Sequence, residues 1–160
     1  MRTWGTISTE VYDTLDERLQ RVMTRVRDEV CDVSLLEGFR NEEDQNQFFD
    51  NGTSKVRWPD GKHNRNPSLA VDFQPYPWPG RESLQYAMLA YVAGAAIAIA
   101  REEGITLRWG GDWNSNGEIT DETFLDLFHL EVSEPNNETN TNSRNVSVAA
   151  DRVPPGNWSK

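Results

Sequence analysis

The most apolar stretch of the chain, residues 86–100 (YAMLAYVAGAAIAIA), places the strongest constraint on its fold. It follows the proline-rich segment PYPWPG and precedes Gly104, so the pattern predicts one helix over 81–103 that ends at this glycine. The apolar run is shorter than the ~20 residues that a bilayer span needs, and it is rich in alanine with a central glycine. The stretch therefore predicts a buried core helix.

Length and charge limit the class of protein. A chain of 160 residues fits one domain and can bury a real core. The formal net charge of −10 argues against a basic surface for nucleic acid or for an anionic membrane. The single cysteine, Cys31, excludes an internal disulfide and a cysteine-rich zinc site. The first residues lack the apolar segment of a secretory signal, so none is expected.

Helices are predicted on both sides of the first strand. Apolar residues at three- and four-residue spacing over 11–30 indicate an amphipathic helix that begins near Glu10, with Ser8 or Thr9 as its cap. A second helix, EEDQNQFFD, is expected after Asn41, whose side chain can cap it. Strands are predicted at 32–39, 68–73, 105–109 and 128–133.

The composition changes at residue 134. The segment that begins EPNNETNTNSRN is almost wholly polar and cannot bury enough apolar area to offset the entropy of ordering it. We therefore expect a domain over 1–133 and a polar C-terminal tail over 134–160 that is partly disordered.

The only two histidines each lie near a carboxylate in the sequence. His63, in a predicted loop, precedes Asp72 by nine residues, and His129 follows Asp126 by three. Asp72 shares its face of the predicted strand with two small residues, which leaves room for an ion. Two imidazoles and one carboxylate suit zinc and leave a fourth position open for catalysis. The spacing alone equally fits an exposed histidine and a carboxylate that accepts backbone hydrogen bonds.

Two further residues have the chemistry that such a site needs. Asp126, placed in a short turn before the last strand, can take a proton from the attacking water and hand it to a leaving amine. Arg40, at a strand end, can stabilise a developing oxyanion. Taken alone, the same residues fit a helix cap and a surface ion-pair partner.

These motifs resemble those of the M15 family of zinc metallopeptidases (the VanY/VanX type), in particular the phage L-alanyl-D-glutamate peptidases. GKHNRNPSLAVD resembles the family's Ser-x-His…Ala-x-Asp motif, and DLFH its Glu/Asp-x-x-His motif. EGFRNEEDQ and LRWGGDW resemble two further family segments, and the match runs in order from about residue 5 to 133. In this chain Gly61 stands where many members have serine, and the His-to-Asp spacing is nine rather than seven.

The resemblance implies a fold and a set of roles. The fold would be α+β, of the hedgehog and D,D-peptidase type, with a small antiparallel sheet that carries the zinc site and packs against helices. His63, Asp72 and His129 would bind Zn²⁺, Asp126 would act as general base and acid, and Arg40 would stabilise the tetrahedral intermediate. Gln45, Trp109 and Trp113 are further candidates for contact with the substrate.

A second metal is suggested by the loop DWNSNGEITDET at 112–123. An EF-hand loop needs oxygen ligands at positions 1, 3, 5, 7 and 9, glycine at 6 and glutamate at 12. Gly117 fits position 6, but Thr123 stands where the glutamate is required. A turn stabilised by its own Asn and Asp side chains is the alternative. The candidate Ca²⁺ ligands are Asp112, Asn114, Asn116, Glu118 and Asp121.

The resemblance implies an endopeptidase that cuts the L-alanyl-D-glutamate bond of the peptidoglycan stem peptide as a phage lysis enzyme. It would be a monomer without nucleic-acid or membrane partners, held in the host cytoplasm until a pore-forming holin releases it to the cell wall. The alternatives are a D,D- or L,D-carboxypeptidase of the same family, a virion component that degrades or binds the wall, and a hedgehog-like domain that holds zinc without catalysis.

Overall fold

The computed structural model describes residues 2–133, which form an α+β fold around one antiparallel sheet. The sheet has four strands in the order β1-β2-β4-β3. Its strands are β1 (Val33–Glu37), β2 (Ala70–Pro75), β3 (Leu107–Gly110) and β4 (Asp126–Val132). This confirms the predicted α+β class with a small antiparallel sheet. The predicted tail at 134–160 lies outside the described residues.

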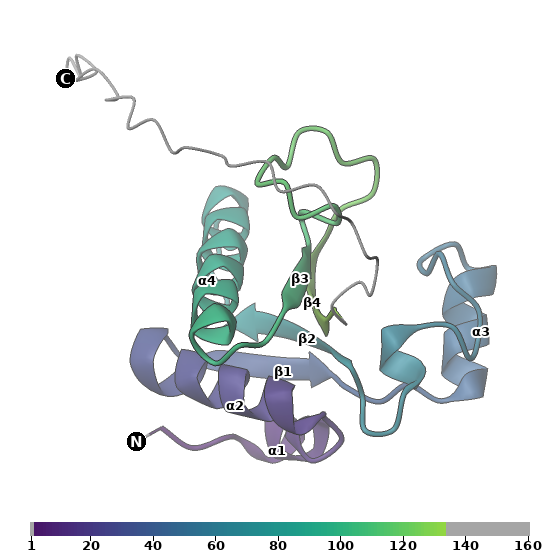
Figure 1. Cartoon of the computed structure of the whole chain (residues 1–160), viewed down its shortest axis with the longest axis horizontal. Coiled ribbons are helices and arrows are strands. Elements are labelled where there is room, and N and C mark those ends of the chain that lie inside the picture. The colour runs from purple at the N-terminus through teal and green to yellow at the C-terminus, as the bar shows by residue number, and fades with distance from the viewer. Residues whose placement is uncertain (1, 134–160) are drawn as a thin grey trace, which may run out of the picture.

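Helices cover one side of the sheet, and a smaller helical lobe extends from its other end. In Figure 1, α4 (Glu82–Glu102) crosses the sheet, and α1 (Thr6–Tyr12) and α2 (Glu17–Arg25) lie along β1. α3 (Glu42–Asp50) stands apart from them, beside the short 3-10 helix of Lys62–Asn64. The α3 lobe therefore lies beyond one end of β1 and β2, while the other helices run alongside the sheet.

α4 confirms the predicted helix but not its complete burial. Its inner face packs into the core through Leu89, Val92, Ala93, Ala96, Ile99 and Ala100. Its outer face is exposed at residues such as Leu84 and Tyr91. Gly104 ends the helix with φ +69, the left-handed conformation that glycine adopts without strain. Among the described residues, α4 is the one helix long and apolar enough to cross a bilayer by length and composition.

The single N-terminal helix predicted from residue 10 to 30 is wrong. The chain forms α1, breaks at 13–16, resumes as α2 and ends in a π-helical turn over Val26–Val30. The break has a tertiary cause: the Ser68 backbone N–H donates to Thr14 O at 2.8 Å, and the Asp16 N–H donates to Ser68 O at 2.9 Å. The Asp16 side chain then accepts from the Arg18 N–H and starts α2.

The predicted caps of the first helix are also wrong, because the N-cap residue is Gly5. Ser8 lies inside α1, where its hydroxyl accepts a hydrogen bond of 3.1 Å from the Leu35 backbone N–H in β1. Asn41 does cap α3, by accepting from the Asp44 N–H at 2.9 Å.

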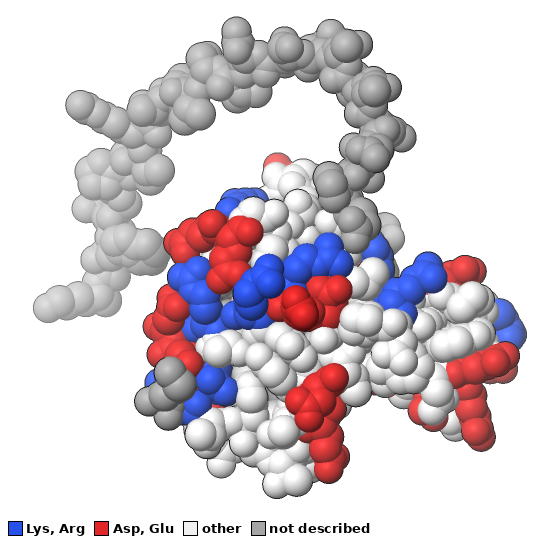
Figure 2. Space-filling view, turned by 60° about the horizontal axis from the view of Figure 1, so that its bottom comes forward, with Lys and Arg blue, Asp and Glu red and all other residues white. Residues whose placement is uncertain are grey.

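Basic and acidic side chains are intermixed on the surface. Figure 2 shows Lys and Arg next to Asp and Glu in a band across one face, with broad uncharged areas below it. Arg25 is an example of this pairing, with Glu29 at 2.7 Å and Glu102 at 2.9 Å. Exposed pairs of this kind each contribute little to stability.

Candidate metal centre

The two strands in the middle of the sheet place a carboxylate and an imidazole side by side. Asp72 of β2 and His129 of β4 are direct partners in the antiparallel register. Their neighbours Val71 and Leu130 point to the other face, where both are fully buried in the core. Because side chains alternate along a strand, the face opposite the core is free to carry polar groups. The alternation predicted for 68–73 is confirmed, although the strand runs from Ala70 to Pro75.

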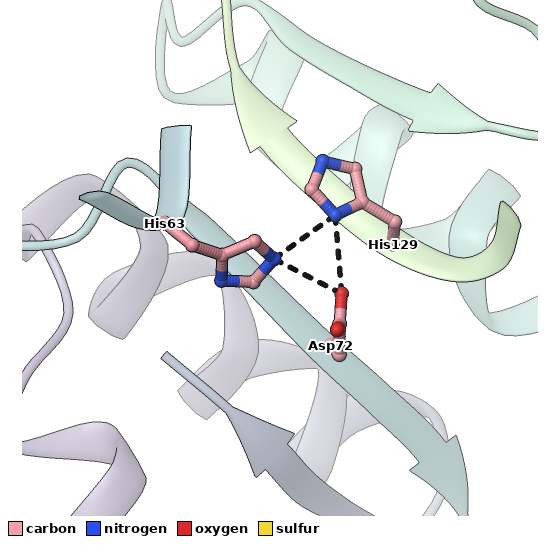
Figure 3. A group of neighbouring side chains, drawn as sticks. All are labelled: His63, Asp72 and His129. Carbon is pink, nitrogen blue, oxygen red and sulfur yellow. Dashed lines mark hydrogen bonds and ion pairs between the residues drawn. The ribbon is translucent and has the colours of Figure 1, made fainter. Parts of the chain in front are cut away.

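His63 completes the group from the 3-10 helix of Lys62–Asn64. Its Nε2 lies 3.1 Å from Nδ1 of His129 and 3.3 Å from Oδ1 of Asp72. The His129 Nδ1 lies 3.1 Å from the same Asp72 oxygen. Figure 3 shows the three side chains pointing toward one another from three separate segments. The structure therefore brings together the three residues predicted as metal ligands, and among the described residues they form the one cluster suited to an ion.

The hydrogen bonds on the far side of each ring set its tautomer. Nδ1 of His63 lies 2.6 Å from the Gly38 carbonyl, which only accepts, so this nitrogen carries the proton. Nε2 of His129 lies 3.1 Å from Oε2 of Glu131 and carries its proton for the same reason. Each neutral ring thus directs a lone pair at the Asp72 oxygen. The two ring nitrogens and the carboxylate oxygen are all acceptors, so they need a cation between them.

Their spacing fits a metal ion. Metal–ligand bonds of about 2.0–2.2 Å in a tetrahedral site separate the ligand atoms by roughly 3.3 Å. The three distances of 3.1–3.3 Å match this value closely. A buried site with two imidazoles and one carboxylate is able to hold a divalent metal, with His63, Asp72 and His129 as its ligands.

The electrostatics show how strongly the site favours positive charge. Burial raises the pKa of Asp72, but hydrogen bonds from His129 and His63 outweigh it and hold the pKa well below its usual range. Burial lowers the pKa of His129, but Asp72 and Glu131 outweigh it and raise the pKa to about 9. In the metal-free protein, a proton on His129 therefore occupies the place of the cation.

A buried carboxylate, paired with a half-buried arginine, supports His129 from behind. Glu131, two residues further along β4, is 4% exposed and receives hydrogen bonds from Arg108 of β3 as well as from His129. Burial raises the pKa of Glu131, but His129 and Arg108 outweigh it and lower the pKa. A carboxylate in this position orients the imidazole and increases its basicity as a ligand.

His63 is held by reciprocal contacts with the chain after β1. Besides the bond from its ring to Gly38 O, its own carbonyl accepts from the Arg40 backbone N–H at 2.9 Å. The Asn64 side chain donates to Arg40 O at 3.1 Å and accepts from the Gly61 N–H at 3.0 Å. A β-carbon on Gly61 would lie 2.7 Å from Oδ1 of Asn64. The glycine at the position where many family members have serine is thus part of this network.

The candidate ligands lie in a pocket of ≈590 Å³ that also contains Asp126 and Arg40. Asp126 is the first residue of β4, not part of a turn as predicted. Burial and the charge of Asp72 raise its pKa, against the opposing effect of the two histidines. Its pocket position and raised pKa suit a group that exchanges a proton.

Arg40 is oriented by a carboxylate and an amide. Its Nε donates to Glu37 at 2.9 Å, a second nitrogen bonds the other Glu37 oxygen, and the third lies 3.3 Å from Oε1 of Gln45. The guanidinium also lies 3.9 Å from Oδ2 of Asp72. Three of its five donors are therefore used within the described residues, and two remain for a ligand.

The three predicted substrate contacts have different surroundings. Trp109 is 6% exposed, belongs to the core and donates to Leu127 O at 2.9 Å, and it does not line the pocket of the candidate ligands. Trp113 lines the pocket with its ring centre 5.5 Å from that of His129. Gln45 also lines the pocket, but its amide is 1% exposed and already donates to Ser54 and Val56. This bonding indicates that Gln45 positions the pocket wall.

The candidate calcium ligands form a compact loop. Oδ2 of Asp121 accepts from the amides of Asn114 at 3.1 Å and Asn116 at 2.7 Å, and Asp112 accepts from the backbone N–H groups of Asn116 and Gly117. Glu118 contributes its backbone N–H to this loop, as a donor to Asn116. The loop thus has the hydrogen bonds of a self-stabilised turn, and calcium binding there stays a prediction.

Several residues that build the site have no catalytic motif in the sequence. Glu131 shares a predicted strand face with His129, and that period-two spacing was the one available signal for it. Arg108, Glu37 and the carbonyl of Gly38 reach the site only through strand pairing and the turn after β1. Local sequence carries no sign of these contacts.

Helices pack on one side of the antiparallel sheet. On the other side, a pocket holds a His–Asp–His group that is backed by a buried carboxylate. This arrangement is that of a metal-dependent peptidase. The family model described as phage L-alanyl-D-glutamate peptidase matches residues 3–133. The chain belongs to this family.

Two relatives agree with this assignment. The chain is 30% identical over 125 residues to the L-alanyl-D-glutamate peptidase of Escherichia phage T5. This match covers 74% of this chain and 87% of the relative. The crystal structure of the Serratia marcescens L-Ala D-Glu endopeptidase ChiX is similar to this fold with a TM-score of 0.61 and 25% sequence identity. That match covers 80% of this chain and 87% of ChiX.

Proposed function

We propose that the chain is a zinc-dependent endopeptidase that cuts the L-alanyl-D-glutamate bond of the peptidoglycan stem peptide during phage lysis. The observation that carries this proposal is the convergence of His63 Nε2, Asp72 Oδ1 and His129 Nδ1 at 3.1–3.3 Å in a pocket. The names of the family and of both relatives supply the bond.

Zinc is the metal that this donor set favours. Two imidazole nitrogens and one carboxylate oxygen are common zinc ligands, and three protein ligands leave a position open. When bound, the metal supplies a Lewis acid that polarises the scissile carbonyl and lowers the pKa of water. The pocket beside the ligands leaves room for the peptide.

Asp126 is the proposed general base and acid. It lines the same pocket as the candidate ligands, and its backbone pairs with Gly110 of β3, just past an irregularity in the β3–β4 register. In its carboxylate form it accepts a proton from the attacking water, and it then delivers this proton to the amine that leaves. Burial raises its pKa, so it keeps the proton more readily than an exposed aspartate would.

Arg40 is the proposed stabiliser of the oxyanion. Glu37 and Gln45 fix the guanidinium plane close to Asp72, and two N–H groups remain available. An oriented cation needs little reorganisation as negative charge develops on the carbonyl oxygen. This preorganisation is the physical reason to prefer Arg40 over a mobile surface cation.

Membership in a phage peptidase family supports a proposal about the biological setting. We propose that the chain works as a monomeric lysis enzyme whose target is the cell wall and whose access to it depends on a holin. Assay of purified phage particles tests the alternative, because a virion component would co-purify with them while a lysis enzyme would remain in the lysate.

We retain calcium binding by the 112–123 loop as a proposal. Support comes from the convergence of Asp112, Asn114, Asn116 and Asp121 in one turn. A bound ion would stiffen the segment between Trp113 and Asp126. Titration calorimetry tests it, with Asp121→Asn as the weakened variant; absence of heat in the wild type would end the proposal.

The central test is digestion of purified peptidoglycan by the zinc-loaded protein, followed by mass spectrometry. We expect fragments with new D-glutamyl amino termini. Free D-alanine would instead indicate a carboxypeptidase, and intact muropeptides would refute the proposed function. His63→Ala should lose one equivalent of metal together with the activity.

A further inference from the structure

We propose that Lys55 and Lys62 form an anion subsite in the pocket, which binds the free carboxylate of the glutamyl residue on the leaving side of the scissile bond. This inference rests on the proposed function, because the carboxylate belongs to that substrate. Besides the metal ligands, the base and the oxyanion stabiliser, the pocket would thus contain residues that select the substrate.

Four cationic side chains line the pocket, and two of them are already neutralised. Arg40 is bound by Glu37 through two nitrogens, and Arg108 is bound by Glu131 in the same way. Their charges therefore serve to hold the pocket wall and the ligand His129. The two donors that Arg40 keeps are the ones assigned above to the oxyanion, so neither arginine is assigned to a substrate carboxylate.

The two lysines are different. Neither Lys55 nor Lys62 has a carboxylate oxygen within 4.0 Å among the described residues, although both line the pocket. Nζ of Lys55 lies 5.2 Å from the centre of the Phe124 ring on the facing loop. A contact with an aromatic face leaves the ammonium its hydrogen-bond donors.

Both lysines stand on backbone that is tied to the site. The carbonyl of Lys62 accepts from the Leu69 N–H at 3.1 Å, so the residue before His63 is fixed to the start of β2. Lys55 lies between Ser54 and Val56, and the buried amide of Gln45 donates to both of these neighbours. Each ammonium therefore extends from a fixed point in the wall.

The charge of the protein makes local cations necessary. With a net charge of −10, its field repels an anionic peptide. Of the five carboxylates that line the pocket, Glu37, Asp72 and Glu131 are paired with Arg or His. Asp126 and Asp60 are the two others, so an incoming carboxylate requires positive charge nearby.

The substrate supplies the matching group. Glutamate has two carboxyl groups, and the stem peptide uses only one of them to continue the chain. A free carboxylate consequently lies within a few bonds of the nitrogen that leaves. The pocket that holds the metal ligands is the same pocket that holds both lysines. A carboxylate bound there would orient the peptide for attack.

The test uses two synthetic stem peptides that differ in one group: one has the free carboxylate of the glutamyl residue, and the other has a carboxamide there. Lys55→Met, Lys62→Met and the double variant are assayed with zinc loaded, and zinc content confirms an intact site. Arg65→Met is the matched control, since it removes a nearby exposed cation that does not line the pocket.

We expect the double variant to lose on the order of tenfold or more in kcat/KM on the carboxylate peptide, mainly through KM, because charge-assisted hydrogen bonds are the strong ones. Its rate on the carboxamide peptide should match that of the wild type, Lys→Arg variants should recover activity, and Arg65→Met should change neither rate.

Equal losses on both peptides would show that the lysines are only structural and would overturn the subsite. Unchanged rates on both would also overturn it. If the zinc-loaded wild type cuts neither peptide, the proposed function itself is wrong, which is a different outcome from a wild type that cuts both without discrimination.

Discussion

Gly110 and Asp126 face each other across the β3–β4 pair so closely that a β-carbon on Gly110 would lie 2.2 Å from the Asp126 carbonyl oxygen. The register of the two strands shifts between Trp109 and Gly110, and this irregularity brings Asp126 to the pocket end of the pair. The glycine in the WGG segment therefore has a positional role, because any side chain there displaces the proposed base.

The first prediction concerns this contact. Gly110→Ala should lower kcat by roughly 10- to 100-fold, because a shift of about 1 Å at a catalytic group has an effect of this size. The metal should remain bound, since no ligand contacts Gly110. Activity and zinc content measured on the same sample check this. Gly94→Ala is the control: apart from the backbone of its own helix, no atom lies within 4 Å of its new β-carbon, and it should stabilise α4 by ~0.5–1 kcal/mol.

Replacement of the proposed base itself gives a second prediction. Asp126→Asn should reduce kcat by about 10²- to 10⁴-fold, the usual contribution of a positioned acid–base group, with zinc content unchanged. In the wild type the active form is the carboxylate. Since burial raises its pKa, activity should fall as the pH decreases through a value above that of an ordinary aspartate. An acidic limb that persists in Asp126→Asn would contradict this role.

The third prediction couples metal affinity to pH. Zinc must displace the proton that His129 holds with a pKa of about 9. Apparent affinity should therefore fall about tenfold for each pH unit below that value. Competition with a coloured chelator across a pH series measures it. In Glu131→Gln the pKa of His129 should drop, so the apparent zinc affinity should begin to fall at a lower pH. Above pH 9 the same variant should bind zinc about 10- to 100-fold more weakly, because the imidazole loses its supporting carboxylate.

The proton on His129 also makes the stability of the metal-free protein depend on pH. The folded metal-free protein holds the His129 proton more tightly than the ordinary value of 6.5, so this group stabilises the fold below that pH. The contribution is lost as the pH rises through about 9. Thermal unfolding of the metal-free wild type should accordingly show a decline between pH 7 and 10 that is smaller in Glu131→Gln.

The two tryptophans of the RWGGDW segment should separate stability from catalysis. Trp109→Ala should lower the free energy of unfolding by about 3–5 kcal/mol, because it empties a core position. Trp113→Ala should affect stability less and alter KM, since its ring faces the pocket beside His129. Chemical denaturation and steady-state kinetics on both variants measure this. A Trp109 variant with normal stability and impaired KM would reverse the assignment.

Elements defined by local chemistry were predictable. Asn41 and the acidic first turn of α3 are a sufficient N-terminal signal for that helix, and Gly104 is a sufficient C-terminal stop for α4. Both boundaries therefore follow from a few neighbouring residues. The convergence of the candidate metal ligands was also predictable, because two histidines with their carboxylates left few combinations and the family motifs ordered them.

Features with a tertiary cause were not predictable. The helix break at 13–16 exists because the backbone of Thr14 and Asp16 bonds that of Ser68, more than fifty residues away. The different positions of Trp109 and Trp113 follow from the turn at Gly111, where the Trp109 ring closes against the backbone. A period-two pattern places both rings on the same face and cannot separate them.

The strand order β1-β2-β4-β3 also determines when the site is able to form during synthesis. Of the strands in the described part of the chain, β4 is the last to leave the ribosome, yet it occupies an interior place beside β2 and supplies His129. A nascent chain that ends before it exposes the pairing edge of β2 and has only two of the three ligand residues. With the three residues as the proposed metal ligands, translation would itself delay metal capture until β4 has been delivered into the sheet.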